Sequence, residues 1–234
     1  MCIASPALLA ADRHSELAVS GVNDVNFGKG NHQAHLGNGF VVQYQGRFFG
    51  VTAKHVLLMG QNTAASGTEL PQGTQWFLRN KAAPEMKNPF GAALNASAAE
   101  PLDLKVLEKD TLVFALDAVP EGFVALKLAD KTVEVGDTLT AIGCSYQAPA
   151  DCSGEKITGQ VVEMTSPHLL VDLGKVKFQD LFGLSGAPVL NEAGELVGLV
   201  SQFLPDSKGV ERAAHFDVAY LRRILQQAMA EKSS

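Results

Sequence analysis

A serine flanked by glycines is the first feature of this sequence that could do covalent chemistry. Ser185 lies in the run 182–190 (FGLSGAPVL), between Gly183 and Gly186, and a short apolar strand is expected at 196–201. Glycines let the backbone turn sharply and approach another molecule closely. Such a turn can aim the N–H groups of Gly183 and Ser185 at one point, where a developing oxyanion could bind. The alternative is a glycine-rich hairpin in which the serine is incidental.

A histidine and a carboxylate with complementary chemistry precede this serine. His55 follows a predicted hairpin over residues 37–53 and enters a short apolar turn of helix, where it could face a cleft or lie in the core. Asp110 leads directly into an apolar strand, and a carboxylate there needs a hydrogen-bonding partner. Histidine can accept the proton of a serine hydroxyl, and a carboxylate can fix its tautomer. Asp103 and Asp117 are the other candidates for this carboxylate.

These segments resemble those of trypsin-like serine proteases. Residues 37–42 (GNGFVV) and 51–56 (VTAKHV) are similar to the segment around that family's general-base histidine, and 183–188 (GLSGAP) resembles its nucleophile loop. The order histidine, aspartate, serine is also the order of that family. Residues 133–143 (VEVGDTLTAIG) are similar to the HtrA-type branch. The resemblance covers most of the chain from about Gly37 onward and leaves residues 59–104 unassigned.

The resemblance implies a catalytic triad. Ser185 would be the nucleophile, His55 the general base and Asp110 the residue that orients the histidine, with an oxyanion hole formed by the N–H groups of Gly183 and Ser185. The implied function is a serine endopeptidase that hydrolyses peptide bonds of a polypeptide substrate through an acyl-enzyme intermediate, without a metal or other cofactor. The alternatives are a catalytically silent module of the same fold that binds peptides or scaffolds partners, and an unrelated all-β binding domain.

The substrate-binding residues follow from the resemblance alone. Gln179, six residues before the serine, takes the position at the base of the primary pocket. A neutral amide there argues against a preference for Arg or Lys, although an aspartate follows it. Ser201, Gln202 and Phe203 match the strand that hydrogen-bonds to the substrate backbone. His215 either lines the pocket wall or faces outward from the last strand.

Three residues depart from the family pattern. Leu184 stands where zymogen-activated members have an aspartate that pairs with a new N-terminus, so no such activation is expected. The peptide at Gly183 could then invert at little cost, and an activating ligand or partner subunit is expected to fix it. Lys54 replaces the commoner alanine before the histidine, and its ammonium is expected to point to solvent. Ala187 replaces the family's second glycine, which should be tolerated.

The spacing of short strands predicts an all-β fold. With the histidine and aspartate in the first half and the serine in the second, we expect two antiparallel six-stranded β-barrels, residues 1–124 and 125–234, with the cleft between them. A C-terminal α-helix is expected after Asp217, because the apolar residues between 218 and 229 form one stripe. Residues 23–35 are polar and rich in Gly and Asn, which predicts a loop.

Length and composition exclude several classes of protein. A chain of 234 residues, 46% apolar, can form one substantial domain or two small barrels. The net charge of −6, with no run of Lys or Arg beyond Arg222–Arg223, argues against a nucleic-acid partner. No apolar run reaches the length of a membrane span. Residues 1–11 are apolar but lack a basic region, so a cytoplasmic location is favoured over export.

The remaining cysteines and histidines suggest no further site. Cys144 and Cys152 flank a short loop and could pair, but free thiols in a reducing cytoplasm are favoured. His32 and His35 lie in the predicted loop without a cluster of partner ligands, so no metal site is expected. His168 lies at a predicted turn between two strands and is expected to be exposed.

Overall fold

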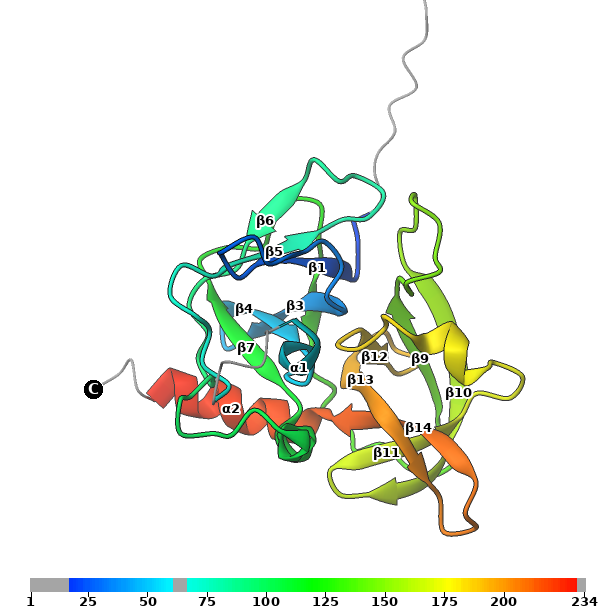
Figure 1. The fold of residues 1–234 in the computed structure, drawn as a ribbon. Helices are drawn as coiled ribbons and strands as arrows, with labels where there is room; N and C mark the ends of the chain where they lie inside the picture. The colour runs from blue at the N-terminus through cyan, green and yellow to red at the C-terminus, as the bar shows by residue number, and fades with distance from the viewer. Residues whose placement is uncertain (1–16, 61–66, 231–234) are drawn as a thin grey trace, which may run out of the picture.

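The structure, a computed structural model that describes residues 17–60 and 67–230, consists of two β-structures side by side (Figure 1). The first is an eight-stranded sheet and the second is a closed six-stranded barrel. A helix ends the described chain, so the predicted all-β fold with a C-terminal helix is confirmed. The N-terminal segment 1–11 and Cys2 lie outside the described residues.

The first sheet has the strand order β6-β5-β1-β3-β4-β7, with β2 paired to β1 and β8 paired to β3. It has two strands more than expected, because the short strands β2 and β8 add to it. β8, which follows the predicted boundary at residue 124, pairs in parallel with β3. The strands are β1 (Gly21–Asn26), β2 (His32–Gln33), β3 (Asn38–Tyr44), β4 (Arg47–Thr52), β5 (Gln75–Arg79), β6 (Lys87–Pro89), β7 (Leu112–Leu116) and β8 (Ala125–Lys127).

The β3–β4 hairpin forms as predicted and positions the segment that follows it. Gln45 and Gly46 make the turn with φ angles of 48° and 78°, and the strands pair from Tyr44↔Arg47 to Gly39↔Thr52. The chain then leaves the sheet and enters helix α1 (Val56–Gly60), which lies between the sheet and the barrel (Figure 1). His55 is therefore held at the junction of the two halves.

The barrel of the second half has the closed order β10-β11-β14-β13-β12-β9. Its apolar core includes Leu139, Val161, Leu169, Val189 and Val197. A short 3₁₀ helix, η2, precedes the serine loop, just as η1 precedes β7 in the first half. The elements are η1 (Leu104–Lys109), β9 (Thr138–Gly143), β10 (Glu155–Thr165), β11 (His168–Asp172), η2 (Phe178–Leu181), β12 (Pro188–Leu190), β13 (Leu196–Pro205) and β14 (Glu211–Asp217).

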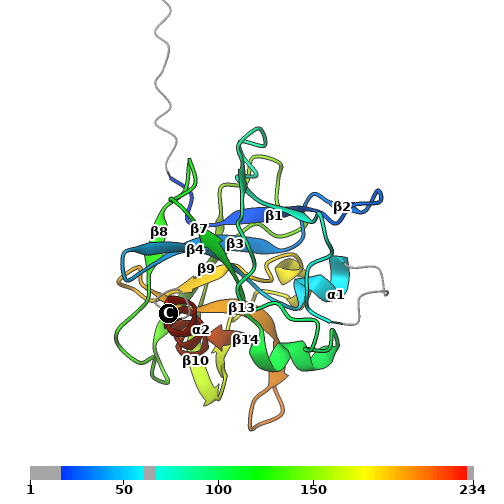
Figure 2. The ribbon, with the colours of Figure 1, turned by 90° about the vertical axis from the view of Figure 1, so that its left-hand side faces the viewer.

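The C-terminal helix α2 (Val218–Ala230) ties the two halves together. It leaves the barrel after β14 and crosses to the first half, where Figure 2 shows it nearly along its axis. Leu221 and Leu225 belong to the same buried cluster as Phe40 and Phe49 of the first sheet. The predicted apolar stripe thus fixes the second half against the first. None of the described helices is long and apolar enough to cross a bilayer.

Part of the predicted loop 23–35 is strand, and that prediction was wrong because its polar residues are buried with partners. Asn23 is fully buried in β1, and its amide donates to the Leu36 carbonyl at 2.9 Å. Asp24, also buried, forms ion pairs with Arg79 and Lys87 on β5 and β6. Polar side chains that satisfy each other inside the sheet give the same sequence pattern as a solvated loop.

Two side-chain predictions in the second half are also corrected. Cys144 and Cys152 form a disulfide, with their Cα atoms 6.1 Å apart, so the expectation of free thiols was wrong for this pair. His168 is buried, because it starts strand β11 beyond the turn and packs edge-on against Phe216. Its Nε2 lies 3.1 Å from Nε2 of Gln202.

Candidate active site

Ser185, His55 and Asp110 come together in one chain of hydrogen bonds. Nε2 of His55 lies 2.8 Å from Oγ of Ser185, and Nδ1 lies 2.7 Å from Oδ2 of Asp110. The backbone N–H of His55 also donates to Oδ1 of Asp110 at 2.9 Å, so the carboxylate holds both the ring and the backbone of the histidine. The first sheet supplies two of these residues and the barrel supplies the third. Asp103 and Asp117 make no such contact among the described residues.

Burial and charge shift the pKa values of this pair in opposite directions. Asp110 is completely buried, and burial raises the pKa of its carboxyl. The charge of His55 and the hydrogen bonds from the His55 ring, the Ser201 hydroxyl and the His55 backbone N–H outweigh this effect and lower that pKa below 3.8. Burial disfavours the imidazolium, but the Asp110 carboxylate raises the pKa of His55 above 6.5. Asp110 is therefore a carboxylate at neutral pH, able to stabilise a proton on His55.

Ser201 contributes a side chain that the sequence prediction assigned only to backbone contacts. Its hydroxyl donates to Oδ2 of Asp110 and is buried with it. It stands at an irregularity of β13, where the pairing with β14 shifts between Val200 and Gln202. The bulge turns the Ser201 side chain toward the carboxylate, and no local sequence signal marks this contact.

The loop before Ser185 has two backbone N–H groups without an acceptor in the described structure, those of Gly183 and Ser185. Gly183 has a φ of 94°, and a Cβ there would lie 2.6 Å from the backbone N of Tyr146, so only glycine fits. The carbonyl of Phe182, on the same peptide as the Gly183 N–H, accepts from Tyr146 N–H at 2.8 Å. This is not the inverted peptide that the sequence led us to consider.

The other predicted substrate-binding residues are only partly gathered around this serine. Gln202 and Phe203 are half-buried on β13, next to Ser201. Gln179 is exposed on η2. His215 is buried on β14, paired across the sheet with Val200, and its Nδ1 has no hydrogen-bond partner among residues 17–60 and 67–230. Burial lowers its pKa to about 4.

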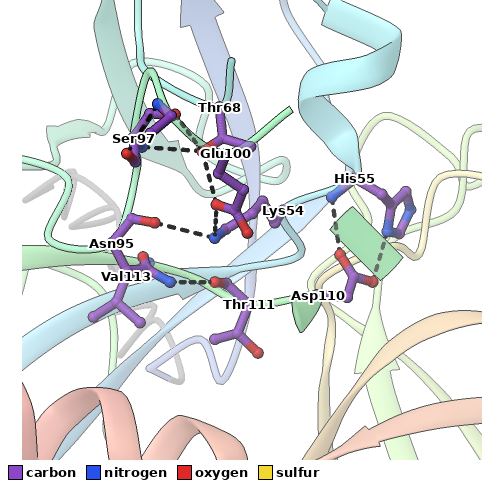
Figure 3. Close-up of polar contacts among 10 residues, drawn as sticks. Lys54, His55, Thr68, Asn95, Ser97, Glu100, Asp110, Thr111 and Val113 are labelled. Atoms are coloured by element: carbon purple, nitrogen blue, oxygen red, sulfur yellow. Dashed lines mark hydrogen bonds and ion pairs between the residues drawn. The ribbon is translucent and has the colours of Figure 1, made fainter. Parts of the chain in front are cut away.

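Lys54 does not point to solvent, and that expectation was wrong. Its side chain is 2% exposed, and its ammonium lies 2.8 Å from Oε2 of Glu100 and donates to the carbonyl of Asn95 at 3.0 Å. Figure 3 shows this cluster beside the His55–Asp110 pair. The carboxylate of Glu100 compensates the buried charge, which makes burial of the lysine tolerable.

The two loop histidines also have partners. Nε2 of His32 lies 2.8 Å from Oδ1 of Asp24. The ring of His35 packs edge-on against Tyr146, and burial with nearby Lys81 lowers its pKa to about 4. Within residues 17–60 and 67–230, no three His, Cys, Asp or Glu side chains cluster as metal ligands would.

The fold is similar to three solved structures of low sequence identity. The structure of HBP has a TM-score of 0.61 and 15% identity, over 93% of this chain and 94% of that chain. The MamO protease domain from Magnetospirillum magneticum has a TM-score of 0.51 and 14% identity, over 90% and 97%. The serine endoprotease from Yersinia pestis has a TM-score of 0.56 and 15% identity, over 90% and 63%. At such identities the likeness shows the fold alone.

Sequence comparison assigns the family. A search of curated proteins finds no match to this chain. Residues 37–199, more than half of the chain, match the family described as trypsin-like peptidase domain, and this range contains all three members of the hydrogen-bonded chain. The protein therefore belongs to the trypsin-like peptidase domain family.

Proposed function

We propose that this protein is a serine endopeptidase that uses Ser185 as nucleophile, His55 as general base and Asp110 as the residue that orients the histidine. The observation that carries the proposal is the unbroken contact from Ser185 Oγ through His55 to Asp110, at 2.8 and 2.7 Å. A serine hydroxyl is a weak nucleophile at neutral pH and needs an adjacent base, which this geometry supplies.

The reaction would proceed in two stages. The Ser185 oxygen attacks the scissile carbonyl while His55 takes the hydroxyl proton, and the N–H groups of Gly183 and Ser185 receive the oxyanion. His55 then protonates the departing amine, which leaves an acyl group on the serine. In the second stage His55 takes a proton from water, whose oxygen attacks the acyl carbonyl. The ester bond to Ser185 then breaks, the Ser185 oxygen takes the proton back from His55, and the new carboxyl end is released. Asp110 stays ionised and stabilises the imidazolium in both stages.

The substrate would be a polypeptide in extended conformation. Residues 202–205 of β13 pair with β14 on one side and Ser201 lies at the bulge, whereas the other neighbour, β12, pairs only with 196–199. Within the described residues the second side of 201–205 therefore has no partner strand. A substrate strand could add there, with its backbone bonded to Ser201–Phe203 and its scissile carbonyl near Ser185. Gln179 and His215 are proposed to shape the primary pocket.

Labelling with a fluorophosphonate, together with casein cleavage, tests the proposal. The wild-type chain should take up one label and cleave casein, and Ser185→Ala should do neither while keeping its melting temperature within a few degrees. Ser153→Ala removes another hydroxyl, on an exposed residue, and should behave as wild type. Unlabelled wild-type protein that binds peptide without cutting it would instead be the catalytically silent module. Equal cleavage by Ser185→Ala would mean a different nucleophile.

A further inference from the structure

The loop that carries the N–H groups of Gly183 and Ser185, called the oxyanion loop below, is held by a buried asparagine of the other half of the molecule. Asn38, at the start of β3, is fully buried, and its side-chain amide donates to the carbonyls of Gly183 at 2.6 Å and Cys144 at 3.0 Å. Its side-chain oxygen accepts from the backbone N–H of Cys144 at 2.9 Å. Its backbone N–H donates to the carbonyl of Ser185 at 2.7 Å. All these bonds cross from the first sheet to the barrel.

We infer that Asn38 is a positioning residue that keeps the Gly183 N–H directed at the oxyanion. The inference rests on the proposed function, since it assigns the device that sets the oxyanion hole of that same site. Asn38 touches neither Ser185 Oγ nor His55 through its side chain, so its effect acts through the loop backbone.

The bonds fix both peptides on either side of Gly183. The peptide that follows Gly183 is fixed twice, because its carbonyl accepts from Asn38 and its N–H, that of Leu184, donates to the Leu181 carbonyl at 3.0 Å. The peptide that precedes Gly183 is fixed at the Phe182 carbonyl by Tyr146 N–H. Tyr146 lies two residues after Cys144, which Asn38 also holds. One side chain thus restrains the glycine on both sides.

An asparagine meets these demands where similar side chains would not. The site offers two carbonyl oxygens and one N–H, which need two donors and one acceptor, and a terminal amide supplies all three. Aspartate has the same shape but no donor, so it would face the Gly183 and Cys144 carbonyls with negative charge. Leucine could make none of these three hydrogen bonds. The close approach also needs Gly37, where a Cβ would lie 2.5 Å from the Ser185 carbonyl oxygen.

Asn38 is itself anchored in the first sheet. Its carbonyl accepts from the Thr52 hydroxyl at 2.6 Å and from the Asn23 side-chain amide at 2.9 Å. Asn23 in turn accepts from Nε1 of Trp76 at 3.0 Å. These bonds join four strands of the sheet, β1, β3, β4 and β5, so the sheet holds Asn38 in a fixed position.

The test compares Asn38→Asp with wild type in cleavage of a peptide substrate and in inhibition by a peptide boronic acid. The boronate places an oxygen in the oxyanion hole, whereas the ground-state substrate depends less on that hole. We expect kcat to fall about 100-fold and the boronate to bind about 100-fold more weakly, with KM changed less than about threefold. Unchanged kcat with a melting temperature lowered as in the control would overturn the inference.

Asn191→Asp is the matched control. The Asn191 amide donates to Oε2 of Glu195 at 3.0 Å, and its side-chain oxygen accepts from the Glu195 N–H at 2.9 Å, in the turn between β12 and β13. This variant also replaces a bonded amide by a carboxylate, but none of these bonds reaches Asn38 or Gly183. It should lose stability while keeping kcat and the boronate affinity of wild type within about threefold. If Asn38→Asp does not fold, Asn38→Ser decides: its shorter side chain cannot reach both carbonyls, and undiminished kcat and boronate affinity would refute the inference. Failure of the wild type itself to cleave would refute the proposed function instead.

Discussion

The buried ammonium of Lys54 forms an ion pair of 2.8 Å with the partly exposed Glu100, and the lysine is the residue directly before His55. Thr68 also donates to this carboxylate at 2.9 Å, and Asn95 next to the lysine bonds to the Thr111 carbonyl at 2.7 Å (Figure 3). The loop around Glu100 is thereby attached to the two segments that carry His55 and Asp110. The ion pair therefore stabilises the segments that hold His55 and Asp110 in place.

Glu100→Gln should lower the free energy of unfolding by about 3 kcal/mol, because it leaves the buried ammonium of Lys54 without a countercharge. Urea denaturation measures this. Asp130→Asn is the control, since its carboxylate is 96% exposed and 4.0 Å from Arg222, and it should change stability by less than about 0.5 kcal/mol. Adding Lys54→Met to Glu100→Gln should restore most of the loss. Wild-type stability of Glu100→Gln alone would show that the ion pair does not stabilise the fold.

The pH dependence of cleavage should show an acid limb with its midpoint above 6.5. The neutral imidazole is the base, and although burial disfavours its protonated form, Asp110 raises the pKa of His55 above 6.5. Activity is therefore lost as pH falls through this raised value. The free energy of unfolding depends on pH in the opposite direction. The ion pair between protonated His55 and Asp110 stabilises the fold fully below pH 6.5, and this stabilisation disappears as pH rises through the raised pKa. A midpoint of the pH profile of kcat/KM below 6.5 would show that burial, and not the Asp110 carboxylate, has the larger effect on the pKa of His55.

Local patterns were enough to find the parts of the site that lie within short segments. The glycines around Ser185, the hairpin before His55 and the apolar strand after Asp110 each produce a signal over a few residues. The long-range contacts produce none. Asn38 and Gly183 are 145 residues apart, and nothing in either segment indicates their bond.

Burial of polar residues explains most of what the sequence could not predict. Lys54 looks solvated until Glu100 is placed beside it, and Asn23 looks like a loop residue until its amide partners are known. Leu184 likewise suggested an unsupported oxyanion loop, but its side chain packs in a buried cluster with Leu181 and Ala187. The need for an activating ligand or partner subunit remains a prediction.

The disulfide predicts the number of reactive thiols. Denatured, unreduced protein should react with about one equivalent of a thiol reagent, from Cys2, because Cys144 and Cys152 are bonded to each other. Replacing both bonded cysteines by alanine should lower the free energy of unfolding by about 2.5 kcal/mol, since the bridge closes a loop of eight residues in the unfolded chain. Three equivalents of thiol in unreduced protein would show that the pair does not form.

His215 should make the protein sensitive to acid. Burial lowers its pKa to about 4, whereas in the unfolded chain its pKa is near 6.5. Its Nδ1 has no partner in the part of the chain that the structure describes. The unfolded state therefore binds more protons between these values, and stability falls as pH drops from 6.5 through 4, by about 3 kcal/mol in total. His215→Leu cannot bind this proton, so it should lose less stability than wild type over the same range.

Urea denaturation of both proteins at pH 7 and pH 4.5 isolates this effect. At pH 7, His215 is neutral in the folded wild type, and only about a quarter of the unfolded molecules carry a proton on it. The difference in free energy of unfolding between variant and wild type at this pH therefore comes from packing and hydrogen bonding. The change in that difference between pH 7 and pH 4.5 measures the proton binding of His215, since His55 and Asp110 titrate alike in both proteins. An equal loss of stability in both would mean that His215 is protonated in the folded protein and has found a partner.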